Sequence, residues 1–137
     1  MNAVRRVLLI EDNHSLREEM VTILELEGYV VDTAANGRIA LERLEKDGSP
    51  DVVLCDLMMP EMDGYETVKA IRANPATAAL PVVILTARDE EQSAQLGLEL
   101  GADGYVTKPF KIRELSASVE AAIAKRTRAR RIRPGAP

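Results

Sequence analysis

Five residues that could act together in phosphoryl chemistry lie at the ends of short apolar runs in this sequence. They are Glu11, Asp12, Asp56, Thr86 and Lys108. Three carboxylates that meet at one place repel one another unless a cation lies among them. Hard oxygen ligands that leave positions open for water suit Mg²⁺. The residue types therefore predict a magnesium site, and a single His14 and a single Cys55 make a zinc site unlikely to form.

The same five residues indicate how such a site would react. A carboxylate beside a metal can attack a phosphoryl donor and form an acyl phosphate. The transition state spreads charge over the phosphoryl oxygens, so it needs the metal and a cation more than a proton relay. We therefore expect Asp56 to be the nucleophile, Glu11 and Asp12 to hold the metal, Lys108 to supply the cation and Thr86 to donate a hydroxyl hydrogen bond.

A repeated pattern of strands and helices would bring these residues together. Buried strands are expected at Val7–Ile10, Tyr29–Thr33, Asp51–Cys55, Val82–Leu85 and Tyr105–Thr107. Amphipathic helices are expected after each strand, the last of them beginning at Pro109. Strands that are apolar throughout are covered on both faces, which predicts a doubly wound five-stranded parallel α/β sheet. The carboxyl ends of its strands meet at one edge, where functional groups gather.

Composition and charge describe one domain with a basic end. The 137 residues carry a formal net charge of −4, but residues 125–137 contain six basic residues and no acid. We expect a domain over residues 1–124 and a flexible tail over 125–137. No apolar run is long enough to cross a membrane, and the run Val7–Ile10 is too short for us to expect a secretory signal. A cytoplasmic protein with no membrane partner is therefore expected, with Cys55 as inert core.

At this point four motifs show a resemblance to a known family. They are Val7–Asn13, Asp56–Gly64, Ile84–Ala87 and Gly101–Phe110. In this order and at these intervals they resemble the receiver domain of two-component response regulators, the family of the chemotaxis protein CheY. The resemblance covers roughly residues 5–124. Within the second motif, Gly64 is expected where the chain needs a permissive turn.

The resemblance implies a phosphorylated switch rather than an enzyme acting on external substrates. Asp56 would accept a phosphoryl group from a phosphohistidine of a sensor histidine kinase or a histidine phosphotransfer protein. Mg²⁺ would be held by Glu11, Asp12, Asp56 and the backbone carbonyl of Met58. Thr86 would move toward the phosphoryl group, Lys108 would pair with it, and Tyr105 would change rotamer with Thr86.

The resemblance also implies an output surface and two residues that tune the rate. A downstream protein would read the face formed by residues 89–100, the strand Tyr105–Thr107 and the final helix. Met58 and Arg88 flank the site where family members vary, so we expect them to tune dephosphorylation. The family's Lys–Pro bond, here Lys108-Pro109, is a cis peptide.

Three alternatives remain open at the level of sequence. The chain could be the receiver part of a longer regulator with a DNA-binding or enzymatic output, although the winged-helix subfamily usually has Arg at the position of Ala94 and Asp at that of Gly104. A phosphatase of the haloacid dehalogenase type would need Asp where Met58 stands. A flavodoxin-like cofactor binder would need a phosphate-cradling loop where Glu11 and Asp12 would repel phosphate. Nucleic-acid binding by this chain alone is not expected, because no aromatic residue interleaves the basic tail.

Overall fold

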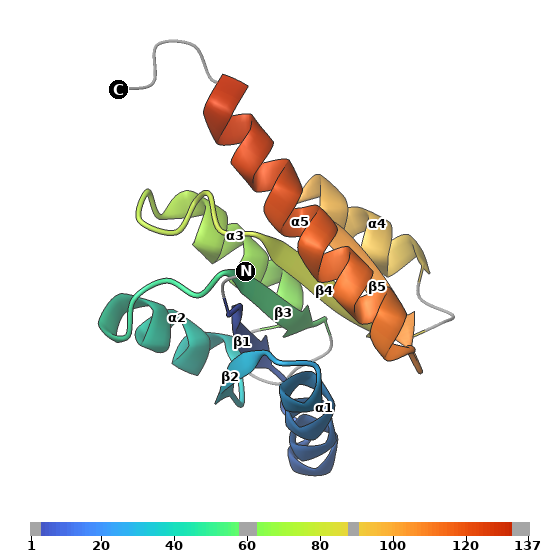
Figure 1. Cartoon of the computed structure of the whole chain (residues 1–137). Helices are drawn as coiled ribbons and strands as arrows, with labels where there is room; N and C mark the ends of the chain where they lie inside the picture. The colour runs from blue at the N-terminus through green and yellow to red at the C-terminus, as the bar shows by residue number, and fades with distance from the viewer. Residues whose placement is uncertain (1–3, 58–62, 88–90, 133–137) are drawn as a thin grey trace.

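A five-stranded parallel sheet forms the centre of the molecule in the computed structural model, which describes residues 4–57, 63–87 and 91–132 (Figure 1). The strands lie in the order β2-β1-β3-β4-β5. Their bounds are β1 Arg6–Ile10, β2 Val30–Ala34, β3 Val52–Asp56, β4 Val82–Ala87 and β5 Gly104–Lys108. The predicted doubly wound parallel sheet is confirmed, and each predicted strand differs from the observed one by only a residue or two at its ends.

Five helices cover the two faces of the sheet. They are α1 His14–Leu26, α2 Gly37–Lys46, α3 Gly64–Ala73, α4 Glu91–Glu99 and α5 Ile112–Ile132. Helices α1 and α5 pack on one face, where alternate strand residues such as Leu9, Leu54 and Leu85 are fully buried. Helices α2, α3 and α4 pack on the other face against Ile10, Cys55 and Ile84. Burial on both faces explains why the strands are continuously apolar.

Local signals at the helix ends fix where the loops begin. The side chain of Asn13 caps α1 by accepting a hydrogen bond from the backbone N–H of Leu16 at 2.9 Å. Asp63 caps α3 in the same way through the N–H of Glu66, also at 2.9 Å. Such caps satisfy backbone donors that the first helical turn leaves unpaired. Helix α1 then ends before Gly28, whose φ of 95° is left-handed and favours glycine.

The last helix differs from the sequence prediction in both its bounds and its contacts. Helix α5 begins at Ile112 rather than at Pro109, and it continues to Ile132. The boundary predicted at residue 124 therefore falls inside a helix. Arg126, which was expected in a flexible tail, is half-buried and donates to Asp103 at 2.7 Å. Residues 125–132 thus continue α5, whereas residues 133–137 of the predicted tail lie outside the described residues.

No helix in the described ranges is long and apolar enough to cross a membrane.

Gly64 has a different role from the one its place in a turn suggested. Its backbone is not left-handed. A Cβ at this position would instead lie 2.7 Å from the carbonyl oxygen of Asp56 and 2.7 Å from the Cα of Leu57. The start of α3 therefore packs directly on the backbone that carries Asp56, so the permissive-turn explanation is corrected to one of close approach.

We expect the Gly64→Ala variant to be destabilised by about 2 kcal/mol, because backbone atoms cannot move aside as a flexible side chain can. Thermal denaturation would measure the loss. Gly104→Ala is the matched control, since a Cβ there meets nothing within 4 Å. Equal melting temperatures for the two variants would contradict the packing explanation.

Candidate functional site

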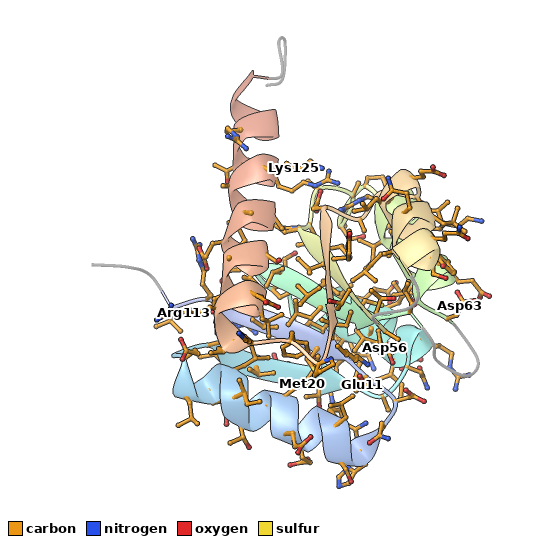
Figure 2. All side chains as sticks on the ribbon, turned by 90° about the vertical axis from the view of Figure 1, so that its right-hand side faces the viewer. Glu11, Met20, Asp56, Asp63, Arg113 and Lys125 are labelled. Atoms are coloured by element: carbon orange, nitrogen blue, oxygen red, sulfur yellow. The ribbon has the colours of Figure 1, made fainter. Side chains whose placement is uncertain are left out.

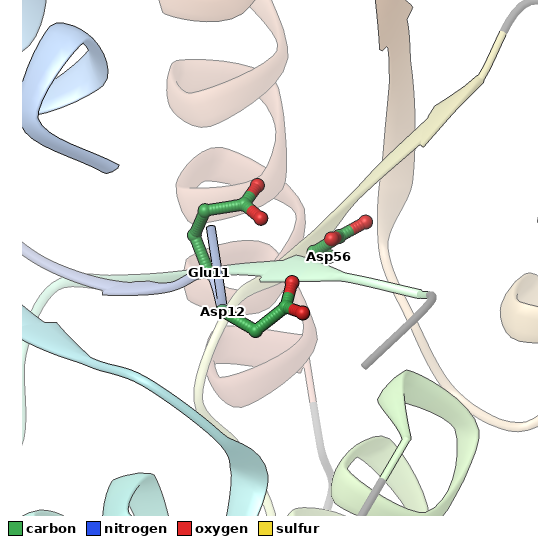
Figure 3. A group of neighbouring side chains, drawn as sticks. All are labelled: Glu11, Asp12 and Asp56. Carbon is green, nitrogen blue, oxygen red and sulfur yellow. The ribbon is translucent and has the colours of Figure 1, made fainter. Parts of the chain in front are cut away.

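Three acidic side chains meet at the carboxyl edge of the sheet, as predicted. Glu11 follows β1 directly, Asp12 comes next, and Asp56 is the last residue of β3. Candidate ligand oxygens of the three carboxylates all lie within 4.8 Å of one another (Figure 3). Glu11 and Asp56 are buried, whereas Asp12 is exposed. The cluster is therefore open to solvent on one side, as a site that exchanges ligands must be.

Lys108 brings a positive charge into this cluster. Its Nζ lies 3.1 Å from Oε1 of Glu11 and 3.4 Å from Oδ1 of Asp56. Lys108 is the last residue of β5 and precedes a cis peptide bond to Pro109. The structure therefore brings the lysine to the acids from a strand that is distant in sequence, as the rule for strand ends predicts.

Among the residues that the structure describes, Lys108 brings one positive charge to a cluster of three acids. Burial, followed by the charge of Asp56, raises the pKa of Glu11 to about 7, although Lys108 and the N–H of Asn13 act in the opposite direction. Because the pKa of Glu11 rises from 4.5 in the unfolded chain to about 7 in the folded protein, its protonated form favours folding. The free energy of unfolding of the metal-free protein should therefore fall as the pH rises from 4.5 toward 7. A bound divalent cation would favour the ionised form. The all-oxygen donor set, with one open side, fits Mg²⁺.

Thr86 presents a buried hydroxyl group with no hydrogen-bond partner among the described residues. The residue lies near the end of β4, the strand beside β3, and is only 1% exposed. Within the described part of the chain its Oγ1 makes no hydrogen bond. A buried unpaired hydroxyl costs about 1–3 kcal/mol, and a catalytic role is one of the reasons for which proteins keep such a group. Thr86 therefore lies on the strand next to the one that carries Asp56, and its predicted hydrogen bond to a phosphoryl group stays a prediction.

The positions of the remaining predicted residues do not test the roles predicted for them, except for Cys55. Tyr105 lies on β5 with its residue 38% exposed, so its predicted switching role stays a prediction. Two predicted residues lie outside the described residues, Met58 and Arg88. The predicted metal ligand of the Met58 carbonyl and the predicted rate-tuning roles of both residues stay predictions. Cys55 is fully buried on the face of α2, α3 and α4, and burial raises the pKa of its thiol, which fits an inert core residue.

Two groups of polar contacts were missed from the sequence. Arg17, one turn into α1, donates to the backbone carbonyl of Glu11 at 2.8 Å. At the opposite end of the sheet, the buried side chain of Asp103 pairs with Arg72 at 3.0 Å and with Arg126 at 2.7 Å. Figure 2 shows Glu11 and Asp56 close together in the lower half of the view and Lys125 near the top. The sequence pattern around Arg17 gave no signal for its contact with Glu11, because that contact depends on how α1 packs against the end of β1.

The family model for the response regulator receiver domain matches residues 7–120. The chain belongs to this family. The four sequence motifs and the acidic cluster all lie within the matched range, so the resemblance inferred from the sequence is confirmed.

Curated relatives of this receiver domain are regulators about twice its length. The transcriptional regulatory protein CpxR homolog of Haemophilus influenzae is 47% identical over 116 residues, which cover 85% of this chain and 49% of that protein. The alkaline phosphatase synthesis transcriptional regulatory protein PhoP of Bacillus subtilis is 42% identical over 117 residues, 85% of this chain and 48% of that protein. The chain thus spans about half the length of the curated relatives it matches.

Solved structures agree with the receiver fold. Chemotaxis protein CheY4 of Vibrio cholerae has a TM-score of 0.79 and 34% identity, covering 88% of this chain and 99% of that one. The receiver domain of a sensor histidine kinase from Pseudomonas aeruginosa has a TM-score of 0.80 and 31% identity, covering 89% of this chain and 99% of that one. That second structure has a magnesium ion coordinated in its active site cleft.

Proposed function

We propose that this receiver domain accepts a phosphoryl group on Asp56 from a phosphohistidine of a histidine kinase or histidine phosphotransfer protein, in a Mg²⁺-dependent reaction. The observation that carries the proposal is the arrangement of Asp56 beside Glu11, Asp12 and Lys108. A buried hydroxyl on the neighbouring strand, which has no partner among the described residues, supports it. No separate substrate is turned over in this scheme, so the protein is a switch rather than an enzyme.

The chemistry follows from the positions of the side chains. A carboxylate oxygen of Asp56 forms a bond to phosphorus while the bond from phosphorus to the histidine nitrogen breaks, and the imidazole retains that electron pair and takes up a proton. Mg²⁺, held by Glu11, Asp12, Asp56 and the proposed Met58 carbonyl, would neutralise charge on the phosphoryl oxygens. Lys108 is near enough to Asp56 to pair with the same oxygens, and Thr86 can donate its hydroxyl hydrogen to one of them.

The signal would pass to a partner through the surface of α4, β5 and α5. Phosphorylation adds a charge of roughly −1.5 to −2 and three strong acceptors. If these acceptors hold Thr86 and Lys108, they favour one of two arrangements at the ends of β4 and β5. Leu96 on α4 and Tyr105 on β5 are exposed at 45% and 38%. Two large exposed apolar side chains on adjoining elements support a protein as the partner.

A second candidate is that this receiver is one part of a longer transcriptional regulator. It is favoured by the relatives, which are named as transcriptional regulatory proteins and are about twice as long as the matched region. One observation weakens the DNA-binding form of this candidate, because Ala94 and Gly104 stand where the winged-helix subfamily usually has Arg and Asp. The natural gene sequence on the far side of Pro137 would decide between the two candidates.

The direct test is to incubate the protein with phosphoramidate or acetyl phosphate and follow its intact mass. We expect one phosphoryl group per chain in the presence of Mg²⁺, none with a chelator, and loss of the adduct with hydroxylamine, which cleaves acyl phosphates. Steady hydrolysis of a small phosphate ester would instead favour the haloacid dehalogenase alternative, and an adduct that forms equally well without Mg²⁺ would contradict the proposal.

A further inference from the structure

The backbone of Glu11 is fixed on both sides by hydrogen bonds. Its N–H donates to the carbonyl of Ala34 at 3.1 Å, and its own carbonyl accepts from Nη1 of Arg17 at 2.8 Å. The carboxylate is held separately, by Lys108 on Oε1 and by the N–H of Asn13 on Oε2 at 3.3 Å. The carbonyl of Glu11 belongs to the peptide group that joins Glu11 to Asp12. The hydrogen bond from Arg17 to this carbonyl therefore fixes that peptide group.

Arg17 is itself held in a defined orientation. Its backbone N–H donates to the carbonyl of Asn13 at 2.9 Å, within the first turn of α1. Its Nη2 lies 3.1 Å from Nδ1 of His14 while Nη1 bonds Glu11. A guanidinium group is planar and rigid, so two bonds from its two terminal nitrogens fix its plane. The half-buried side chain thus forms a brace from α1 to the end of β1.

We propose that Arg17 is a positioning residue for the metal ligands, and this inference rests on the proposed Mg²⁺-dependent function. Asp12 is exposed, so the direction of its side chain depends on the peptide that precedes it. By holding the carbonyl of that peptide, Arg17 sets where the Asp12 carboxylate lies relative to Glu11 and Asp56. Groups that orient metal ligands commonly change metal affinity by about 10–100-fold when they are removed.

The charge of Arg17 makes the inference testable. Loss of its positioning contact would weaken Mg²⁺ binding, whereas loss of its positive charge would strengthen Mg²⁺ binding. A guanidinium near the site repels Mg²⁺, so if charge alone mattered, its removal would tighten binding. If positioning matters more, its removal weakens binding despite the loss of that repulsion. A measured dissociation constant therefore distinguishes the two effects by its direction alone.

The experiment is calorimetric titration of Mg²⁺ into wild-type protein and into Arg17→Ala, Arg17→Lys and Arg43→Ala. Arg43 also lies on a helix and its ion pair with Asp47 is exposed, so Arg43→Ala is a control with the same charge change. We expect Arg17→Ala to raise the dissociation constant by about 10-fold or more. Arg17→Lys keeps the charge but loses the planar fork, so an intermediate increase is expected, and Arg43→Ala should change little.

Melting temperatures of the metal-free proteins show whether each variant is folded, and Arg17→Lys provides the decisive comparison if Arg17→Ala does not fold. Unchanged or tighter Mg²⁺ binding in a folded Arg17 variant would overturn the positioning role. Failure of the wild-type protein to bind Mg²⁺ would instead count against the proposed function itself. The two failures are therefore distinguishable.

Discussion

The Asp56→Asn variant is expected to form no phosphoryl adduct with acetyl phosphate and Mg²⁺, whereas the wild-type protein forms one. An amide oxygen is a far weaker nucleophile than a carboxylate, so the bond to phosphorus cannot form at this position. The loss should be complete within the sensitivity of intact-mass measurement, because in the proposed scheme Glu11 and Asp12 would hold the metal. It is the largest functional effect predicted for any single substitution in the chain.

Asp63→Asn provides a control with the same chemical change close to the site. Asp63 caps α3 through the N–H of Glu66, and asparagine is an equally good cap. This variant should fold normally and retain phosphorylation. If Asp56→Asn kept the adduct while Asp63→Asn lost it, the assignment of the phosphoacceptor would be wrong.

The Asp56→Asn variant should also alter stability in a defined direction. Removing one negative charge relieves the repulsion that helps to raise the pKa of Glu11. Without metal, the variant should melt at a higher temperature than wild-type protein at neutral pH. The additional stabilisation by Mg²⁺ should be smaller, because one ligand charge is gone. Thermal melts with Mg²⁺ and with a chelator would measure both effects.

The largest effect on stability is expected for Asp103→Ala. The Asp103 carboxylate is fully buried and pairs with Arg72 at 3.0 Å and Arg126 at 2.7 Å. It also accepts the backbone N–H of Val82 at 2.9 Å. Removing it leaves the half-buried Arg72 without its carboxylate partner, and burial already lowers the pKa of that guanidinium. Breaking a buried ion pair by removing one partner costs about 3 kcal/mol or more, or a fall in melting temperature of roughly 10 °C.

Two variants separate the contributions to this network. Asp103→Asn keeps an acceptor for Val82 but loses the charge, so its melting temperature should lie between those of wild type and Asp103→Ala. Lys125 pairs with Asp103 only at 3.6 Å and is 58% exposed, so Lys125→Ala should cost less than about 1 kcal/mol. Mg²⁺ affinity should be retained in all three variants, because the network lies at the other end of the strands. A loss below about 1 kcal/mol for Asp103→Ala would show that its partners are satisfied without it.

The strands and the acidic site could be predicted from the sequence because both depend on short-range signals. Apolar runs mark the strands, and the residue that follows each run necessarily lies at the carboxyl edge of a parallel sheet. That reasoning placed Glu11, Asp56 and Lys108 together although up to 97 residues separate them.

Contacts between loops and helix ends could not be found in this way. Asp103 meets Arg72 across 31 positions and Arg126 across 23, and nothing in the local pattern of any of the three residues indicates the pairing. Gly64 illustrates the same limit: a glycine in a loop suggests a conformational need, whereas the reason here is the backbone of Asp56 beside it. The role of Arg17 depends similarly on where a helix packs rather than on its sequence.

The ion pair between Asp103 and Arg126 affects how α5 presents its end to other molecules. Arg126 also donates to the carbonyl of Gly101 at 3.2 Å, so α5 is clamped one to two turns before Ile132. From that clamp the helix extends roughly 9 Å to Ile132, at about 1.5 Å per residue. Each residue also turns the helix by about 100°. Inserting a single residue after Arg126 would therefore lengthen the helix by about 1.5 Å and rotate every later residue by about 100° around the helix axis.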